Sequence, residues 1–571
     1  MKNKKINPEM KYLALWGWSS ILFSVFLAFP HAMENGISSL PSWFFRDLVI
    51  GMAVSVPLSG AVWLIRTCRT QILRFQNKEM KSGTLFWIVL IGLCLIWMIP
   101  FLAYFPGIFG ADAPLQSAMM LGIRPLSNHH PLLHTIIFGG LLRLSLQVFG
   151  TAQAGLAIYI LVFQILFTAY ALARAMLSLH QRKVPAWILL LMTLILAVNP
   201  IVMVLVCYTT KDIPFAAALL LFVVSLSELL IPIQKKQGRA DLKACSIRTF
   251  VWGLLMGLLR SQGVYMAFGA LILLLFQYRN HLKSRRFRIA EGIQTLIVAV
   301  CLLISSGLPA LGLVQKVDFR EAIHVPIQQM ASVLRADALS ETPLMTEQLR
   351  NDALYYFDEF ENEPFDAQEV DSYSADYAKY HFITARMKEN PLQFLKTWYR
   401  LLRTDFSAAA DSTIWLTAPY FNMTYSPHNA LITHEEQELE GSRLDISSHS
   451  LLPGVRSWLN NTVSETSDRE NCPFWLRLFD PAISLFLLLF LLGYTLIFRN
   501  RLISLVLIYP LLYALTMLLG PVALLRYSYI YLMEWPFLFG ALLVPASESS
   551  RQSVSDRTDR QLSGNAAPMA E

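Results

Sequence analysis

The sequence predicts an α-helical polytopic membrane protein with about twelve membrane-spanning helices and a mainly helical domain outside the membrane. Composition is the first observation, because 55% of the 571 residues are hydrophobic and only 15% are charged, more than a soluble core requires. The second is that apolar runs long enough to span a membrane alternate with basic loops. The third is an acidic, aromatic-rich stretch at 314–473 that is long enough to fold as a domain.

The net charge of +7 is unevenly distributed along the chain. Residues 316–473 hold 13 lysines and arginines against 25 acids, so the rest of the chain is strongly basic. Basic residues collect in the cytoplasmic loops of membrane proteins, so this asymmetry indicates orientation in a membrane and no nucleic acid partner. The six cysteines have no metal-ligand spacing and predict neither a disulfide framework nor a zinc site.

Predicted spans follow from apolar length and from the side on which basic residues fall. Four lysines before the first apolar run place the N-terminus inside. The segment 250–276 has basic flanks at both ends, so we expect two short helices that meet at Arg260 and return to the same side. The remaining predicted spans are residues 12–30, 48–65, 85–104, 154–177, 186–206, 213–231, 289–313, 476–498, 502–519 and 527–543.

Residues 131–149 are apolar enough to span, but a crossing there would put the basic loop at Lys183 outside. We therefore predict a helix that lies along the membrane interface, where Arg143 and Gln147 reach water.

Four regions result from this layout. They are an N-terminal transmembrane module, 1–313, with an external loop and interfacial helices at 104–153; an external domain, 314–473; C-terminal transmembrane helices, 474–545; and a disordered tail, 546–571. The protein is expected in the cell (plasma or inner) membrane with both termini cytoplasmic.

The first external loop contains Asp112. Pro106 and Gly107 end the preceding helix, because proline lacks an N–H and glycine tolerates unusual backbone angles. Two interpretations of Asp112 stay open: a chemically active acid outside a span, or the N-cap of a helix that starts at Ala113 and Pro114.

Other polar residues at the predicted outer ends of spans converge on the same face. Each has a plainer interpretation: Asp212 as a helix cap, Arg260 and Arg526 as anchors for lipid phosphate, and His130 as a loop packing residue. The residues are His129, His130, Lys211, Asp212, Arg260 and Arg526. Intramembrane or rim ionisable groups are costly, so they predict a functional site.

The strings PGIFGADAPLQ, HHPLLHT, TTKDIPF, LLRSQG and VPIQQ, with an Arg-Tyr pair opening the last span, resemble the GT-C superfamily in order and sidedness. These are membrane glycosyltransferases that use polyprenyl-phosphate-linked sugars. The fuller strings are most similar to an uncharacterised bacterial membrane family known as a domain of unknown function. Two features depart from the pattern: the first-loop acid is single where many relatives carry an acidic pair, and His129-His130 precedes one proline where relatives often have two.

The resemblance implies inverting transfer of a sugar from a polyprenyl-phosphate donor to a cell-envelope glycan or lipid acceptor on the outer face. Asp112 would be the general base, and Asp212 would orient Lys211 or the acceptor. A divalent cation, Mg or Mn, shared by the two acids stays open as a cofactor. The predicted substrate-binding residues are His129, His130, Lys211, Arg260, Gln328, Gln329 and Arg526, with the three cations on the phosphate and the glutamines in an acceptor groove.

Two other functions are compatible with the composition. A lipid or solute transporter usually places its substrate site at the middle of the membrane between repeats, and the sequence shows no repeat. A scaffold with a binding domain outside the membrane would use the aromatic residues between Tyr355 and Tyr380 but needs no converging acids and cations.

The charge distribution makes a topological prediction. In a variant without native cysteines, a cysteine at position 340 should react with an impermeant thiol reagent added outside intact cells, whereas one at 183 should not. A cysteine at 285 serves as a second cytoplasmic site. Labelling at 183 but not at 340 would invert the predicted topology.

Overall fold

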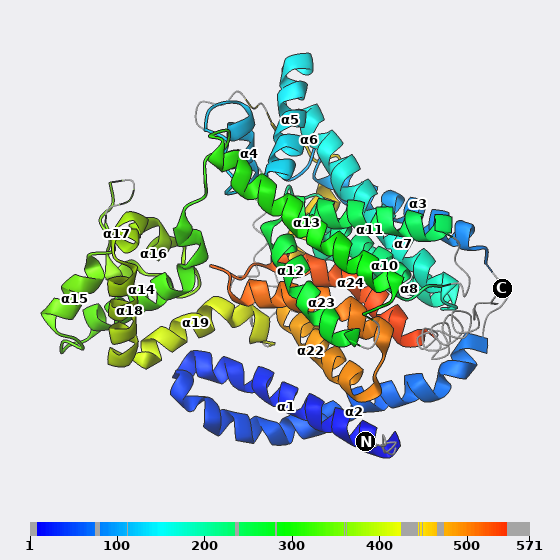
Figure 1. The fold of residues 1–571 in the computed structure, drawn as a ribbon, viewed down its shortest axis with the longest axis horizontal. Coiled ribbons are helices and arrows are strands. Elements are labelled where there is room, and N and C mark those ends of the chain that lie inside the picture. Colours follow the sequence, from blue (N-terminus) through cyan, green and yellow to red (C-terminus); the bar gives the residue numbers. More distant parts are fainter. Residues whose placement is uncertain are drawn as a thin grey trace, which may run out of the picture.

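The computed structural model describes residues 8–74, 80–110, 112–233, 239–279, 282–358, 360, 362–423, 444, 446–447, 449–464 and 473–544. The predicted tail at 546–571 lies outside the described residues. The described part is built from helices that group into a large apolar bundle and a smaller cluster at one end of it (Figure 1).

The first half of the chain supplies most of the bundle. Its helices are α1 (Pro8–Asn35), α2 (Leu40–Arg74), α3 (Ser82–Ala103), α4 (Ala113–Met120), α5 (Leu132–Phe149), α6 (Gln153–Ile158), the π-helical η2 (Tyr159–Leu166), α7 (Phe167–Gln181), α8 (Ala186–Ala197), α9 (Pro200–Leu205), α10 (Asp212–Leu230), α11 (Arg239–Leu259), α12 (Ser261–Gln277) and α13 (Arg285–Ala310).

The second half forms the smaller cluster and then returns to the bundle. Its helices are α14 (His324–Leu339), α15 (Glu347–Leu354), α16 (Asp376–His381), α17 (Thr384–Glu389), α18 (Pro391–Thr404), α19 (Phe406–Phe421), α20 (Pro453–Ser464), α21 (Phe474–Arg477), α22 (Pro481–Phe498), α23 (Arg501–Leu518) and α24 (Leu525–Leu543).

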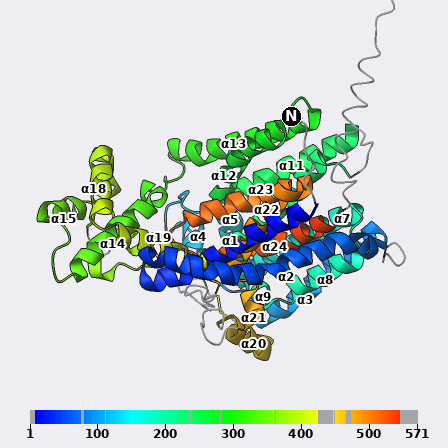
Figure 2. The same ribbon diagram turned by 90° about the horizontal axis from the view of Figure 1, so that it is seen from below.

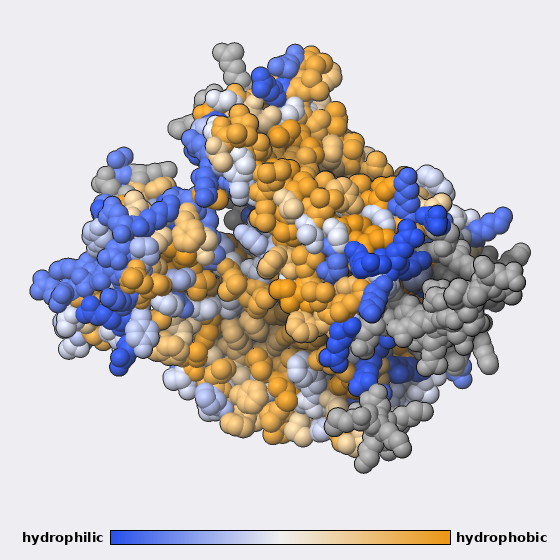
Figure 3. Space-filling model, in the orientation of Figure 1, coloured by the Kyte–Doolittle hydropathy of each residue, from blue (hydrophilic) through white to orange (hydrophobic). Residues whose placement is uncertain are grey.

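Ten helices in the described ranges are long and apolar enough to cross a membrane, so the chain is a multi-pass membrane protein. They are α1, α2, α3, α5, the continuous helix α6–η2–α7, α10, α11, α13, α22 and α23. Two shorter apolar helices, α8 and α12, accompany them. An apolar surface covers much of the bundle, and the smaller cluster is mainly hydrophilic (Figure 3).

The residues predicted as a span at 186–206 do not form one continuous helix, because the chain breaks between α8 and α9. Asn199 caps α9 by accepting a hydrogen bond from the Val202 N–H at 3.1 Å. Pro200 has no N–H to continue α8, so the helix ends before it. The predicted break at Arg260 is confirmed, since Arg260 has extended backbone angles (φ −157°, ψ 135°) between α11 and α12.

Helix α10 is the centre of the bundle. All of its 19 residues are buried, and it packs against α7, α11, α13, α23 and α24. The α1–α2 hairpin lies along the outside of this core and packs against α22 and α19 (Figure 2). Because α10 begins at Asp212, the most enclosed helix carries a predicted site acid at its first residue.

The smaller cluster has its own hydrophobic core, formed by residues of α14, α15 and α16 to α19 such as Ile327, Met330, Phe382 and Phe394. It accounts for the first part of the predicted domain at 314–473, whereas α20 packs against α3 and α9 of the bundle. The cluster lies at the end of the bundle opposite α8 (Figure 1). Which end faces the outside stays a prediction.

Helix α5 runs at a clear angle to α10 and α7 in Figure 1. It packs against α4 and α6, and its exposed residues include the apolar Leu144 and Val148 and the polar Arg143 and Gln147. Its predicted position along the membrane interface stays a prediction.

Close backbone contact between α5 and α6 leaves no room for a side chain at Gly155. A Cβ at Gly155 would lie 2.5 Å from the Leu141 carbonyl oxygen and 3.0 Å from Leu142 Cα, and backbone atoms cannot rotate aside. We expect Gly155→Ala to destabilise the protein by about 1–3 kcal/mol, measured by thermal unfolding in lipid. Gly140→Ala on α5 is the control, because its Cβ meets nothing within 4 Å. Equal unfolding temperatures for the two variants would show that α5 and α6 do not pack as described.

Candidate functional site

Two loops that are distant in sequence are joined through their backbones. The Ile108 N–H donates to the Cys207 carbonyl at 2.8 Å, and the Thr209 N–H donates to the Ile108 carbonyl at 2.9 Å. Gly107 makes this approach possible, because it has φ +140° and a Cβ there would lie 2.7 Å from Ile160 Cγ1. The pairing places the loop of Asp112 beside the loop that carries Lys211 and Asp212.

Asp112 is held by cations and not by the helix that follows it. It occupies the N-cap position of α4, but its side chain makes no capping hydrogen bond. Lys211 Nζ instead donates to Asp112 Oδ2. The same Nζ lies 3.3 Å from His130 Nδ1, and His130 Nδ1 lies 3.8 Å from Asp112 Oδ2. The carboxylate is therefore free of the capping role and engaged in an ion pair.

Asp212 forms a second, more deeply buried ion pair. Arg260 Nη1 donates to Asp212 Oδ1, and Thr210 Oγ1 donates to Asp212 Oδ2 at 3.0 Å. The guanidinium of Arg260 lies over the ring of Tyr527 at 4.8 Å and near that of Tyr513 at 5.6 Å, both cation–π distances. The break between α11 and α12 is what brings Arg260 to this position.

Arg526 connects the two pairs. Its Nη2 lies 3.8 Å from Asp112 Oδ1, and its Nε lies 3.7 Å from Asp212 Oδ2. One guanidinium from α24 therefore contacts both acids. We refer to Asp112, His130, Lys211, Asp212, Arg260 and Arg526 as the site cluster, and six of the nine predicted site residues lie in it.

The charges of the cluster shift two pKa values outside the spans. Burial would raise the pKa of the Asp112 carboxyl, but the positive charges of Lys211 and Arg526 outweigh it and hold the pKa well below its ordinary value. Burial lowers the pKa of His130 to about 3, and the nearby Lys211 charge acts in the same direction. Asp112 is therefore ionised and His130 neutral at pH 7.

A divalent cation shared by the two acids does not fit these residues. Arg526 contacts both carboxylates, and each carboxylate already has a second cationic partner. Within the described ranges, no group of three or more His, Cys, Asp or Glu residues is arranged to hold a metal ion. The acids are compensated by the protein's own cations.

Three predicted residues are not brought into the cluster. His129 is exposed and contacts the ring of His130, with centroids 4.6 Å apart. Gln328 donates to the Asp371 carbonyl at 2.6 Å. Gln329 bonds Trp398 and Thr413 at 3.0 and 3.1 Å. The two glutamines thus hold the smaller cluster together, and their place in an acceptor groove stays a prediction.

Buried polar residues around the loop that carries Lys211 were not predicted. His134 lies between Gln116, at 2.9 Å, and the hydroxyl of Tyr159, at 2.5 Å. Gln164 Nε2 donates to the Tyr208 carbonyl at 3.1 Å. Tyr159 and Gln164 both belong to the π-helical segment η2, a type of insertion that frequently marks functional sites. A lone glutamine in the apolar run at 154–177 was the available signal.

Comparison with known proteins finds one protein family whose model matches the chain. A model of a family of unknown function, DUF6020, matches residues 124–559, a range that contains Lys211, Asp212, Arg260 and Arg526 and begins after Asp112. No curated protein matches the chain. The crystal structure of ArnT from Cupriavidus metallidurans bound to undecaprenyl phosphate is 12% identical and covers 84% of this chain and 81% of that one, with a TM-score of 0.31. That score is too low to transfer a ligand or a mechanism.

Protonation of His130 should make stability depend on pH. Its folded pKa is about 3, below the value of about 6.5 in an unfolded chain, so only the unfolded state gains a proton as pH falls below about 6.5. Stability should therefore fall on acidification to pH 5.5, by up to about 1.4 kcal/mol per pH unit from this residue. His130→Asn, which keeps an acceptor for Lys211, should reduce the difference in unfolding temperature between pH 7.5 and 5.5. His129→Asn, at the exposed neighbour, should not. An unchanged difference in His130→Asn would show that His130 is not buried as a neutral group.

Proposed function

We propose that this chain, which belongs to the DUF6020 family, is a glycosyltransferase that moves a sugar from a polyprenyl-phosphate donor to a cell-envelope acceptor at the outer face of the membrane, with inversion. The site cluster is the observation that carries the proposal, because it gathers acids and cations from four separate segments of the chain at the ends of helices. Such groups are costly in a membrane protein and are retained for function.

The charge of the cluster favours an anion with a single negative charge. Lys211, Arg260 and Arg526 exceed the two carboxylates by one positive charge, since His130 is neutral at pH 7. A phosphodiester that links a sugar to a polyprenol carries one negative charge, which would bring the site to neutrality. A diphosphate carries more charge than the cluster offers.

Unused hydrogen-bond donors in the cluster point to the same ligand. Lys211 has donors only, so His130 Nδ1 must accept from it and the proton lies on Nε2. That Nε2 is buried without a hydrogen bond, and so is Arg526 Nε, whose ion-pair contact with Asp212 is 3.7 Å long. Buried donors need acceptors, and phosphate oxygens supply several at once.

The reaction is a direct displacement at the anomeric carbon. The acceptor hydroxyl loses its proton to Asp112 while its oxygen bonds the anomeric carbon, and the bond from that carbon to the phosphate oxygen breaks. The electron pair leaves with the polyprenyl phosphate, whose growing charge Lys211, Arg260 and Arg526 stabilise. One displacement inverts the anomeric configuration.

Asp112 becomes a base only when the donor is bound. Lys211 and Arg526 lower its pKa in the unliganded cluster and make it a weak base. A donor phosphate would attract both cations and add a negative charge nearby, and both effects raise the pKa of Asp112. We therefore infer that the donor binds before the acceptor is deprotonated. His129, at the exposed edge of the cluster, is left for the acceptor.

A transfer assay tests the function. The full-length protein in lipid vesicles would be incubated with polyprenyl-phosphate hexose and pentose donors and a cell-envelope extract, and released polyprenyl phosphate and the glycosylated acceptor would be measured. Transfer from one donor supports the proposal. Donor movement across the bilayer without transfer would favour a transporter, and neither transfer nor donor binding would favour a scaffold.

Asp112→Asn should separate chemistry from donor binding. The amide keeps the shape but cannot take a proton, so the transfer rate should fall by about 10²–10⁴ while donor binding is retained, because the cations bind the phosphate. Asp405→Asn is the control: Asp405 caps α19 by accepting from the Ala408 N–H at 2.9 Å, and asparagine caps equally well. Full transfer by Asp112→Asn at normal abundance in the membrane would exclude Asp112 as the base.

A further inference from the structure

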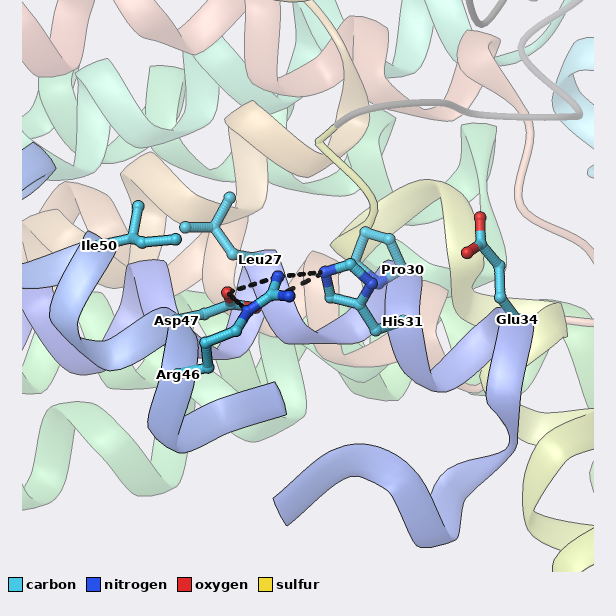
Figure 4. Close-up of a pocket in the computed structure, with 7 residues that line it drawn as sticks. All are labelled: Leu27, Pro30, His31, Glu34, Arg46, Asp47 and Ile50. Atoms are coloured by element: carbon cyan, nitrogen blue, oxygen red, sulfur yellow. Dashed lines mark hydrogen bonds and ion pairs between the residues drawn. The ribbon is translucent and has the colours of Figure 1, made fainter. Parts of the chain in front are cut away.

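A small cavity with both apolar and polar walls lies between α1 and α2, outside the site cluster. Its volume is about 230 Å³, below the ~300 Å³ at which sites for whole small molecules begin. Leu27, Pro30 and Ile50 form its apolar wall. His31, Arg46, Asp47 and Glu34 form the polar side (Figure 4).

Asp47 is a buried acid with an unused acceptor. The residue is 1% exposed although it lies on a helix long and apolar enough to span the membrane. Its Oδ1 accepts from Arg46 Nε at 3.1 Å. Its Oδ2 is buried without a hydrogen bond and lies 3.9 Å from His31 Nε2. A buried carboxylate oxygen of this kind is expensive unless a donor from a ligand reaches it.

Two nitrogen-bearing side chains of the cavity, His31 and Arg46, lie against the ring of Trp43. The imidazole of His31 stacks on Trp43 with centroids 3.8 Å apart, and the guanidinium of Arg46 lies 4.1 Å from a Trp43 ring centroid. Arg46 Nη2 lies 3.0 Å from His31 Nε2, which must accept because arginine only donates. Arg46 is held in place yet half exposed, so it retains donors for an anion beside the unused acceptor of Asp47.

We propose that this cavity binds the headgroup of an aminophospholipid, with the ammonium on Asp47 and the phosphate on Arg46 and His31. Phosphatidylethanolamine has this chemistry, since its ammonium donates hydrogen bonds and its phosphate lies two carbons away. A choline headgroup has no N–H for Asp47 Oδ2. A glycerol headgroup has hydroxyl donors but no positive charge to place beside the Asp47 carboxylate.

The surroundings identify the ligand as a lipid and not a soluble amine. Phe45 and Val49 on α2 are 69% and 70% exposed, and Ile50 at the cavity wall is 46% exposed. These apolar side chains flank the polar cavity along a hairpin that packs on the outside of the bundle (Figure 2). Acyl chains would lie against them while the headgroup enters the cavity. Tryptophan beside a cationic group is typical of the membrane interface. This site does not depend on the proposed transferase activity.

Native mass spectrometry of the full-length protein tests the assignment. The protein would be offered phosphatidylethanolamine, phosphatidylglycerol or phosphatidylcholine with the same acyl chains, and we expect one phosphatidylethanolamine to be retained preferentially. Asp47→Asn removes a charge-assisted hydrogen bond, so retention should fall by about 10–100-fold. Arg46→Gln, at a half-exposed residue that folding tolerates, should also weaken it.

Matched variants distinguish a specific headgroup-binding site from general contact with lipid. Arg143→Gln, at an exposed arginine of α5, and Glu291→Gln, on α13, should leave retention unchanged. Equal retention of the three lipids, or unchanged retention in both Asp47→Asn and Arg46→Gln, would overturn the proposal. Binding of soluble O-phosphoethanolamine without retention of the lipid would assign the cavity to a soluble amine phosphate and overturn the lipid assignment.

Discussion

The ion pair between Asp212 and Arg260 is the interaction on which the site depends. Asp212 opens the most enclosed helix of the bundle, and an uncompensated carboxylate at such a position costs several kcal/mol. Arg260 compensates it only because α11 ends one residue earlier and α12 starts one residue later. The aromatic rings of Tyr513 on α23 and Tyr527 on α24 then lie beside the guanidinium, and α23 packs against α12. Arg526, the residue before Tyr527, lies within reach of Asp112 in the same arrangement.

Sequence reasoning predicted the parts of this arrangement that depend on local chemistry. Pro106 and Gly107 at the turn, the break at Arg260 and the ionisable groups at helix ends are all visible in residue types. The contacts that join them are not, because the bonds between Ile108 and residues 207 and 209 are made by backbone groups that every residue has. The break at Asn199-Pro200 was not predicted, because the apolar run at 186–206 is long enough for one span. The capping signal of Asn199 was given less weight than this length. The hydrogen bonds of Gln328 and Gln329 could not be predicted either, because their partners, Asp371, Trp398 and Thr413, are distant in sequence.

The smaller cluster contacts the loop that leads into α24. The Ala375 N–H donates to the Pro521 carbonyl at 2.9 Å, and His324 Nε2 donates to the Leu519 carbonyl. Arg526 follows five residues after Pro521, at the start of α24. A ligand that moves the smaller cluster would therefore act on Arg526 through a short segment of backbone. Through these hydrogen bonds the smaller cluster is connected to the site cluster. The site residues predicted in the smaller cluster, Gln328 and Gln329, do not themselves belong to the site cluster.

Exposure separates the roles of the two acids. The side chains of Asp112 and Lys211 are 20% and 16% exposed, whereas those of Asp212 and Arg260 are 1% and 5% exposed. Breaking the deeper pair would leave uncompensated charges in a low dielectric, which costs about 3–5 kcal/mol. Breaking the shallower pair costs less, because water and an incoming phosphate replace the lost contacts. In the proposed reaction, an anion would exchange with Asp112 for Lys211 and leave the Asp212–Arg260 pair intact. That proposal assigns the chemistry to Asp112 and gives Asp212 the role of holding Arg260 and Arg526 near the anion.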